Sequence, residues 1–213
     1  MPDFFEFFIL LILLLPSVVL HEVSHGLVAN MLGDPTARNA GRLTLNPISH
    51  VDVVGSFIVP LTFFFATGGF FGWAKPVPVN PSNLRGKYAS ALVSIAGPAS
   101  NFAIAIVFAA FTRIALQLDA VNENFVQILV WIVLVNVTLG LFNLLPLPPL
   151  DGSHILFTFL PTSLEHMKVF LLQYGMFLVM GLILLNLVLN GAVLDIFFKG
   201  IERPLVDFLV GVP

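Results

Sequence analysis

The sequence contains no cysteine and few charged residues. Of its 213 residues, only 10% are Asp, Glu, Lys or Arg, whereas soluble domains carry roughly 25%. The absence of cysteine excludes disulfide bonds and thiolate metal ligands, which leaves His, Asp and Glu as the strong metal ligands. The formal net charge is −3 and there is no run of like charges, so we expect no nucleic-acid partner.

Apolar sequence is abundant instead. Hydrophobic residues make up 58% of the chain, and its mean hydropathy is +0.99. We therefore predict an all-α polytopic membrane protein, integral to a lipid bilayer, that forms a single domain over residues 1–213. A helix needs about 20 apolar residues to cross the hydrocarbon core, and a scan at that length predicts about five transmembrane helices. They cover roughly residues 4–32, 53–73, 88–117, 125–146 and 164–190.

The first apolar segment is predicted to be a retained transmembrane helix and not a signal peptide. Its amino-terminal flank carries Asp3 and Glu6 in place of Lys or Arg, and no small-residue cleavage site follows it. Gly33 followed by Pro35 is typical of the end of such a helix.

The most polar connection spans residues 34–52. Alternating residue types over 42–46 favour a short β-strand, which beside a metal site could pair with an extended substrate backbone. An ordinary surface loop explains so short a segment equally well. Farther on, the prolines of residues 75–81 exclude a helix and favour a stiff, extended connector.

The pattern His21-Glu22-Val23-Ser24-His25 closes the first apolar segment. On a helix successive residues turn by about 100°, so His21 and His25 point in directions only about 40° apart and can share one metal ion. Glu22, on the flank of that face, can take a proton from water activated by zinc. The alternative is a pair of buried, hydrogen-bonded histidines, but ionisable residues at membrane depth favour a functional site.

A catalytic zinc needs a third protein ligand from elsewhere in the chain. The extended motif with a local third histidine is excluded, because Val28 and Met31 stand at the positions that would be glycine and histidine. Asp151 is the strongest candidate, because three prolines just before it break the fourth segment and present its carboxylate toward a cavity. The other candidates are Asp34, His50, Asp52 and His154.

The third apolar segment is rich in small residues, which indicates a central helix in close contact with its neighbours. Within it, Asn101 follows Gly97-Pro98 by about one turn and needs a polar partner at membrane depth. It could join helices to one another or face the active site.

These motifs together resemble those of the site-2 protease family of intramembrane zinc metalloproteases. The resemblance is carried by the His21–His25 motif, by Gly97-Pro98-Ala99-Ser100-Asn101, and by the stretch from Asn143 to Gly152. It implies one zinc ion per chain with His21, His25 and Asp151 as ligands, and Glu22 as the catalytic base.

The resemblance also implies roles outside the metal site. Asn143 is expected near the substrate or the developing oxyanion, and Asn101 is a weaker candidate for substrate binding. The expected substrate is another transmembrane protein, cleaved in or near its membrane segment, and the expected location is a prokaryotic cell membrane. Because no PDZ domain or other module is present in the sequence, we interpret the chain as a minimal form.

A different function class stays open from the sequence. A membrane metal transporter or a metal-binding scaffold without protease activity would also carry such ligands. Many transporters contain inverted repeats, and none is evident here. The sequence predicts neither an oligomeric state nor an orientation in the membrane.

Overall fold

In the computed structural model, residues 4–67, 72–118, 122–189, 192, 196 and 198–211 are described. Within these ranges every regular element is helical, in agreement with the predicted all-α class. The longer helices are α1 (Phe4–Met31), α3 (Val59–Thr67), α4 (Ala89–Leu116), α5 (Glu123–Asn143), α6 (Asp151–Phe159), α7 (Glu165–Val188) and α9 (Arg203–Val210). The shorter elements are α2 (Thr36–Asn39), η1 (Pro47–Ser49), η2 (Val54–Ile58), η3 (Pro81–Asn83), η4 (Thr162–Leu164) and η5 (Phe198–Glu202).

Four helical stretches in the described part of the chain are long and apolar enough to cross a bilayer. They are Phe5–Met31, Ala89–Leu116, Glu123–Asn143 and Thr162–Asn186. These four stretches confirm an integral, multi-pass membrane protein and coincide with four of the five predicted segments. Of the segment predicted at 53–73, residues 68–71 lie outside the described part. The described remainder holds the shorter apolar helix Val54–Phe65, so the count of five is not confirmed.

Contacts at its two ends explain why that segment is short. The Trp73 N–H donates to the Gly55 carbonyl at 3.0 Å, and the Lys75 N–H donates to the His50 carbonyl at 2.9 Å. The Trp73 ring also packs on Gly55, where an added Cβ would lie 2.3 Å from the indole nitrogen. Trp73 therefore lies beside the start of η2, and the described helix between Val54 and Thr67 is too short for a full crossing.

The strand predicted at residues 42–46 is not confirmed either. This stretch has no regular structure, although several of its groups find partners elsewhere. The Arg42 N–H donates to the Ala37 carbonyl at 2.9 Å, and the His50 ring donates through Nε2 to the Thr44 carbonyl at 2.9 Å. Because the Thr44 carbonyl is taken by a side chain, the segment does not join a ladder there.

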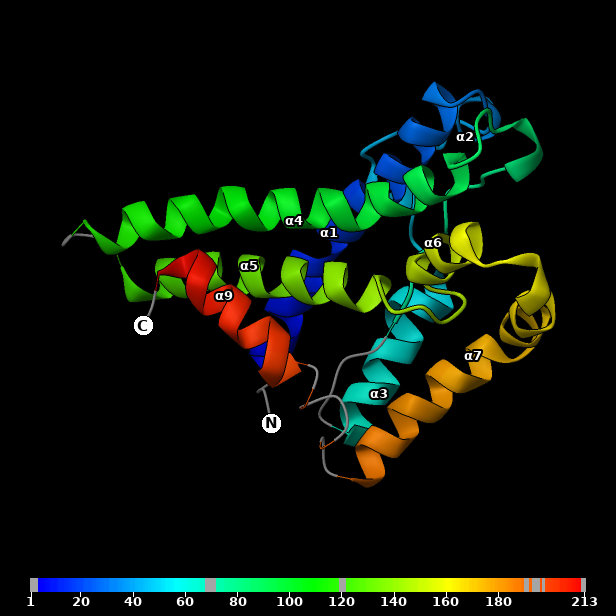
Figure 1. Cartoon of the computed structure of the whole chain (residues 1–213). Coiled ribbons are helices and arrows are strands. Elements are labelled where there is room, and N and C mark those ends of the chain that lie inside the picture. Colours follow the sequence, from blue (N-terminus) through cyan, green and yellow to red (C-terminus); the bar gives the residue numbers. More distant parts are fainter. Residues whose placement is uncertain are drawn as a thin grey trace.

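Helices α1, α4 and α5 form the packed centre of the molecule. Figure 1 shows α4 and α5 running side by side, with α1 crossing them. Small residues of α4 allow this close approach, as predicted. The buried cluster on this side joins α4, α5 and α9 through Ala105, Ala109, Val133, Val137, Val206 and Val210.

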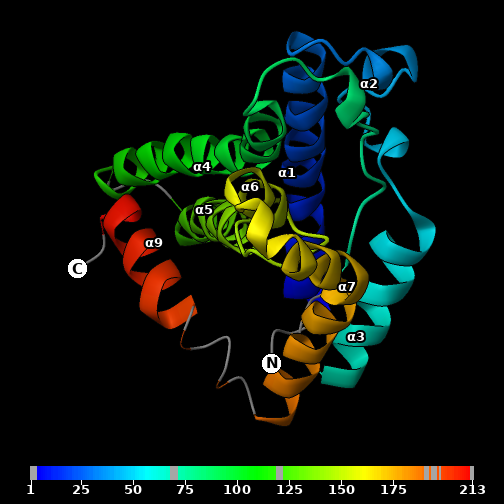
Figure 2. The same ribbon diagram turned by 45° about the vertical axis from the view of Figure 1, so that its right-hand side comes forward.

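Between α5 and α6 the chain runs without regular structure, and other parts of the protein cover some of its residues. Leu150 packs against Val179 and Ile183 of α7, with Phe63 of α3 at the edge of the cluster. Figure 2 shows α3 and α7 lying next to each other below this point. Irregular backbone is tolerated at membrane depth when other parts of the protein bury it. This packing places Asp151 at the first residue of α6, beside α1.

Candidate metal centre

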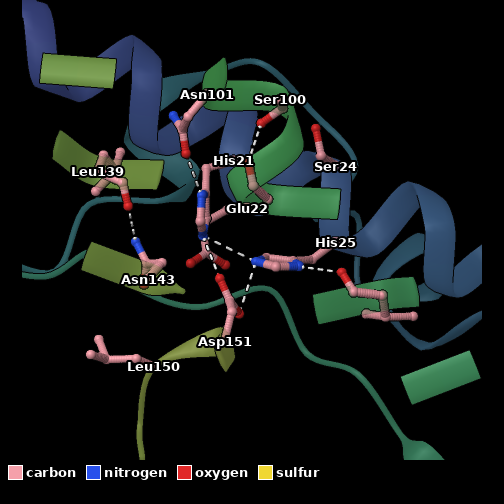
Figure 3. Close-up of polar contacts among 12 residues, drawn as sticks. His21, Glu22, Ser24, His25, Ser100, Asn101, Leu139, Asn143, Leu150 and Asp151 are labelled. Atoms are coloured by element: carbon pink, nitrogen blue, oxygen red, sulfur yellow. Dashed lines mark hydrogen bonds and ion pairs between the residues drawn. The ribbon is translucent and has the colours of Figure 1, made fainter. Parts of the chain in front are cut away.

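Helix α1 presents two histidines on one face, one turn apart. Both are buried, with 5% of His21 and 8% of His25 exposed. Their rings lie nearly perpendicular with centroids 4.7 Å apart, and their Nε2 atoms approach to 3.1 Å. The helical spacing of the motif therefore brings two ring nitrogens to one point, as Figure 3 shows.

Asp151 reaches the same point from the start of α6. Its Oδ2 lies 3.1 Å from His21 Nε2, and its Oδ1 lies 3.3 Å from His25 Nε2. Oδ2 is buried and has no hydrogen-bond partner among the described residues. Within the described part of the chain, these three side chains form the one His, Asp and Glu group whose ligand atoms lie close enough to hold a metal ion.

The geometry of the three side chains fits a zinc ion. His25 Nδ1 faces the Val93 carbonyl at 2.7 Å, so Nδ1 carries the hydrogen and a neutral ring has its lone pair on Nε2. His21 Nδ1 faces Asn101 Oδ1 at 2.6 Å and is oriented in the same way. Around a tetrahedral zinc with bonds of about 2.0–2.1 Å, neighbouring ligand atoms lie about 3.3–3.4 Å apart. The two Nε2 atoms lie 3.1 Å apart, and each lies 3.1–3.3 Å from a different oxygen of the Asp151 carboxylate, which is close to that edge length.

Electrostatics supports this interpretation of the cluster. Two lone pairs and a carboxylate that converge within about 3 Å repel one another unless a cation lies between them. Without a cation, the Asp151 oxygen that lacks a hydrogen-bond partner would carry the desolvation cost of an unsatisfied buried polar group, about 1–3 kcal/mol or more for a charged one. A divalent cation removes both penalties.

Glu22 lies beside this point without joining the group of possible ligands. Its Oε2 accepts a hydrogen bond from the Val77 N–H at 2.6 Å. Val77 belongs to the proline-rich connector, which runs without helix from residue 72 to residue 80, as its prolines predict. The connector therefore fixes the direction of the Glu22 carboxylate.

A cavity of about 330 Å³ opens at the cluster. It is bounded by α1, α4, α6, the proline-rich connector and the end of α5. Its lining residues are His21, Glu22, His25, Pro76, Val77, Val79, Pro81, Leu84, Ser90, Val93, Ser94, Asn143, Pro149, Asp151 and His154. Polar and apolar side chains contribute about equally to its walls.

The two asparagines predicted as site residues occupy different positions. Asn143 lines the cavity at the end of α5, and its Nδ2 donates to the Leu139 carbonyl at 2.9 Å. Asn101 is fully buried behind His21 and does not line the cavity. Its contact with the His21 ring places it among the groups that hold a possible metal ligand.

The other candidates for the third ligand have separate surroundings. His154 lines the cavity but is not part of the cluster. Asp52 accepts a hydrogen bond from the Gly55 N–H at 2.7 Å, and the His50 ring bonds to the Thr44 carbonyl.

Asp34 joins the end of α1 to the turn that follows the proline-rich connector. It accepts hydrogen bonds from Thr36, from the Asn80 N–H at 2.7 Å and from Asn83 Nδ2 at 2.9 Å. Burial alone would raise the pKa of Asp34, but these donors outweigh it and lower the pKa to about 2. The ionised Asp34 carboxylate therefore holds the end of α1 against the turn at Asn80 and Asn83, a role called the Asp34 clamp below.

Gly97 is a site residue whose role sequence reasoning did not identify. A Cβ added there would lie 2.3 Å from His25 Nε2 and 2.6 Å from His21 Nε2. Helix α4 can approach the two rings only because this residue has no side chain. The small-residue pattern of the segment indicated close packing, but not that the packing partner is the histidine pair.

Comparisons with known proteins agree on one family. The model of Peptidase family M50 matches residues 112–186. Two bacterial relatives carry the name "Putative zinc metalloprotease". YwhC of Bacillus subtilis is 40% identical over 175 residues, which cover 78% of this chain and 75% of the relative. Rip2 of Mycolicibacterium smegmatis is 32% identical over 177 residues, which cover 83% of this chain and 66% of the relative.

A third relative, "Zinc metalloprotease MJ0392" of Methanocaldococcus jannaschii, is 30% identical over 160 residues, or 75% of this chain and 37% of the relative. No solved structure matches the chain. The identity to YwhC over three quarters of both proteins, together with the family match, confirms the resemblance drawn from the motifs. The chain belongs to peptidase family M50, the site-2 protease family.

Proposed function

We propose that this protein is an intramembrane zinc metalloprotease that hydrolyses peptide bonds in or near the transmembrane segments of other membrane proteins. His21, His25 and Asp151 hold the zinc ion, and Glu22 is the general base. The observation that carries the proposal is the convergence of two Nε2 atoms and a carboxylate within 3.1–3.3 Å, on a membrane-spanning helix and at the end of a cavity.

The residues of the chain take distinct parts in this reaction. When bound, zinc supplies a Lewis acid that makes water a stronger nucleophile and polarises the substrate carbonyl. Glu22 accepts the proton of the attacking water and then donates it to the departing amine nitrogen. Asn143 donates an amide N–H to the carbonyl oxygen on which negative charge builds. Among the described residues its Nδ2 makes one hydrogen bond, to the Leu139 carbonyl, which leaves a second hydrogen for this role.

The cavity favours an unwound substrate. An α-helix with its side chains is about 10–12 Å wide, and a space of about 330 Å³ is too small to enclose one. A few residues in extended conformation fit against the apolar walls formed by Val79, Leu84 and Val93. A transmembrane helix would therefore have to unwind locally before its peptide bond reaches Glu22.

The Glu22→Gln variant tests this proposal. The amide keeps the size of the side chain and can still accept from Val77, but it cannot take a proton from water. We expect zinc content to be unchanged and proteolysis to fall by at least about 100-fold. The measurement compares membrane fractions of cells that express the intact protein or the variant, with new amino termini identified by mass spectrometry.

The expected result is a set of cleavages inside or beside transmembrane segments that occurs with the intact protein and disappears with Glu22→Gln. Cleavage at a normal level by the variant would contradict the assignment of Glu22 as the base. Zinc binding by the intact protein without any cleavage dependent on Glu22 would support metal binding or transport instead.

A further inference from the structure

A chain of buried polar groups leads away from the rear of His21, across three helices. The His21 Nδ1 atom lies 2.6 Å from Asn101 Oδ1 on α4. Asn101 Nδ2 donates to Asn136 Oδ1 on α5 at 3.1 Å, and Asn136 Nδ2 donates to Ser17 Oγ on α1 at 3.0 Å. Asn101 and Asn136 are fully buried, and 4% of Ser17 is exposed.

The bonds of Asn136 fix the orientation of its own amide. Its Nδ2 has two hydrogens, and both have acceptors, namely Ser17 Oγ and the Ile132 carbonyl at 2.9 Å. The Ser17 hydroxyl donates its one hydrogen to the Leu13 carbonyl at 3.0 Å, so its oxygen can only accept from Asn136. The Oδ1 atom of Asn136 is therefore the atom that must face Asn101.

Asn136 in turn fixes the orientation of Asn101. A flipped Asn101 amide would place its oxygen against Asn136 Oδ1 and against the Ser17 carbonyl, which lies 3.4 Å from Nδ2 in the observed orientation. Oxygen atoms without a hydrogen between them repel, and unmet polar groups are costly at this depth. The oxygen of Asn101 is thus held toward His21.

The orientation of Asn101 matters more than the corresponding contact of His25. The His25 ring bonds to the Val93 carbonyl, which can only accept. The His21 ring bonds to a side-chain amide, which in its flipped orientation would donate to Nδ1 and move the ring hydrogen to Nε2. A hydrogen on Nε2 would block the nitrogen that faces His25 and Asp151.

We propose that Asn136 and Ser17 are positioning residues for the metal site. They fix the Asn101 amide so that His21 keeps its hydrogen on Nδ1 and its lone pair on Nε2. This inference rests on the proposed zinc site, but it assigns a role to two residues that touch neither the metal position nor the substrate cavity. Partners of this kind commonly change metal affinity by about 10- to 100-fold.

The test measures zinc affinity of the purified full chain by competition with a chelator, without any substrate. Asn136→Ala should lower the affinity by about 10- to 100-fold. Ser17→Ala removes the acceptor that holds the Asn136 amide, so it should also lower the zinc affinity. Thr112→Val is the matched control, because Thr112 is equally buried and, among the described residues, its hydroxyl bonds to the Phe108 carbonyl of its own helix and to no other group.

A double-mutant cycle with Asn101→Ala separates positioning from packing. If Asn136 acts through Asn101, then Asn136→Ala should have no further effect on zinc affinity once Asn101 is alanine. The visible absorption spectrum of the cobalt-substituted protein should change in either single variant and not in Thr112→Val. The unfolding temperature of the metal-free protein reports packing separately.

Equal zinc affinity of Asn136→Ala and the intact protein would overturn the proposal, whatever the unfolding temperature. Additive losses in the double variant would also overturn it. If Asn136→Ala does not fold, unchanged zinc affinity in Ser17→Ala is sufficient to overturn it. Failure of the intact protein to bind zinc would instead contradict the proposed function itself.

Discussion

Replacing Gly97 with alanine should disable the metal site through a single methyl group. The added Cβ would lie 2.3 Å from His25 Nε2, 2.6 Å from His21 Nε2 and 2.6 Å from His21 Cε1. Ordinary contact begins near 3.4 Å, so the rings must retreat by about 1 Å or α4 must move away from α1. Neither ring can move freely, because each is held from behind through its Nδ1 atom.

The expected loss of zinc affinity in Gly97→Ala follows from the narrow range of zinc–ligand distances. Zinc to nitrogen distances vary by about 0.2 Å around their usual value, so a displacement of about 1 Å breaks coordination. We expect zinc affinity and proteolysis to fall by at least about 100-fold. Overpacking should also lower the free energy of unfolding by about 1–3 kcal/mol. Helix propensity alone predicts the opposite sign, since alanine is about 1 kcal/mol better than glycine in a helix interior.

Gly181→Ala is the control for this substitution. Gly181 lies in α7, a membrane-spanning helix, and an added Cβ would meet no other atom within 4 Å. Zinc content, measured by elemental analysis of the purified protein, should be normal in Gly181→Ala and lost in Gly97→Ala. Normal zinc content and cleavage in Gly97→Ala would refute the position assigned to α4 against the histidine pair.

Three further predictions concern residues around the same site. Asp151→Ala should lower zinc affinity and abolish cleavage, whereas His154→Ala should lower zinc affinity by no more than about 10- to 100-fold. Equal loss of zinc affinity in both variants, measured by chelator competition, would contradict the assignment of Asp151 as the ligand. Val77→Pro removes the N–H that orients Glu22, and proline fits the extended backbone at this position. The variant should keep its zinc but lose about 10-fold or more in kcat, whereas Val77→Ala should stay near normal. Equal kcat values for Val77→Pro and Val77→Ala would contradict this prediction. The pKa of Asp34 of about 2 lies below its ordinary value of 3.8, so the ionised form stabilises the fold above about pH 4 and this contribution is lost toward pH 2. The difference in unfolding temperature between the intact protein and Asp34→Asn should therefore shrink over that range, and a constant difference would rule out the Asp34 clamp.

The class of the fold and the local geometry of the motif were predictable from sequence. Long apolar segments indicate membrane helices because length and hydropathy are local properties. The approach of His21 to His25 follows from helical periodicity in the same way. The count of five crossings was not confirmed, because the shortening of residues 53–73 depends on Trp73 packing on Gly55, a contact between two ends of the segment.

Long-range contacts within the site were harder to predict. Asp151 was favoured through a proline-broken setting and a family resemblance, since no local rule brings α6 to α1. The strand at residues 42–46 was suggested by an alternation too short to exclude a loop, and the His50 ring occupies the Thr44 carbonyl. Asn136 gave no signal in the sequence, because a single asparagine in an apolar helix does not reveal its partner.

The central claim is that two histidines and one aspartate hold a zinc ion within the membrane domain. X-ray absorption at the zinc edge of the purified protein tests this claim most directly. We predict about one zinc per chain, with two imidazole nitrogens at about 2.0–2.1 Å, one carboxylate oxygen from Asp151 and one further light atom. In Asp151→Ala the carboxylate contribution should disappear together with most of the bound zinc. A spectrum with two imidazoles and one carboxylate that is the same in the intact protein and in Asp151→Ala would contradict the account.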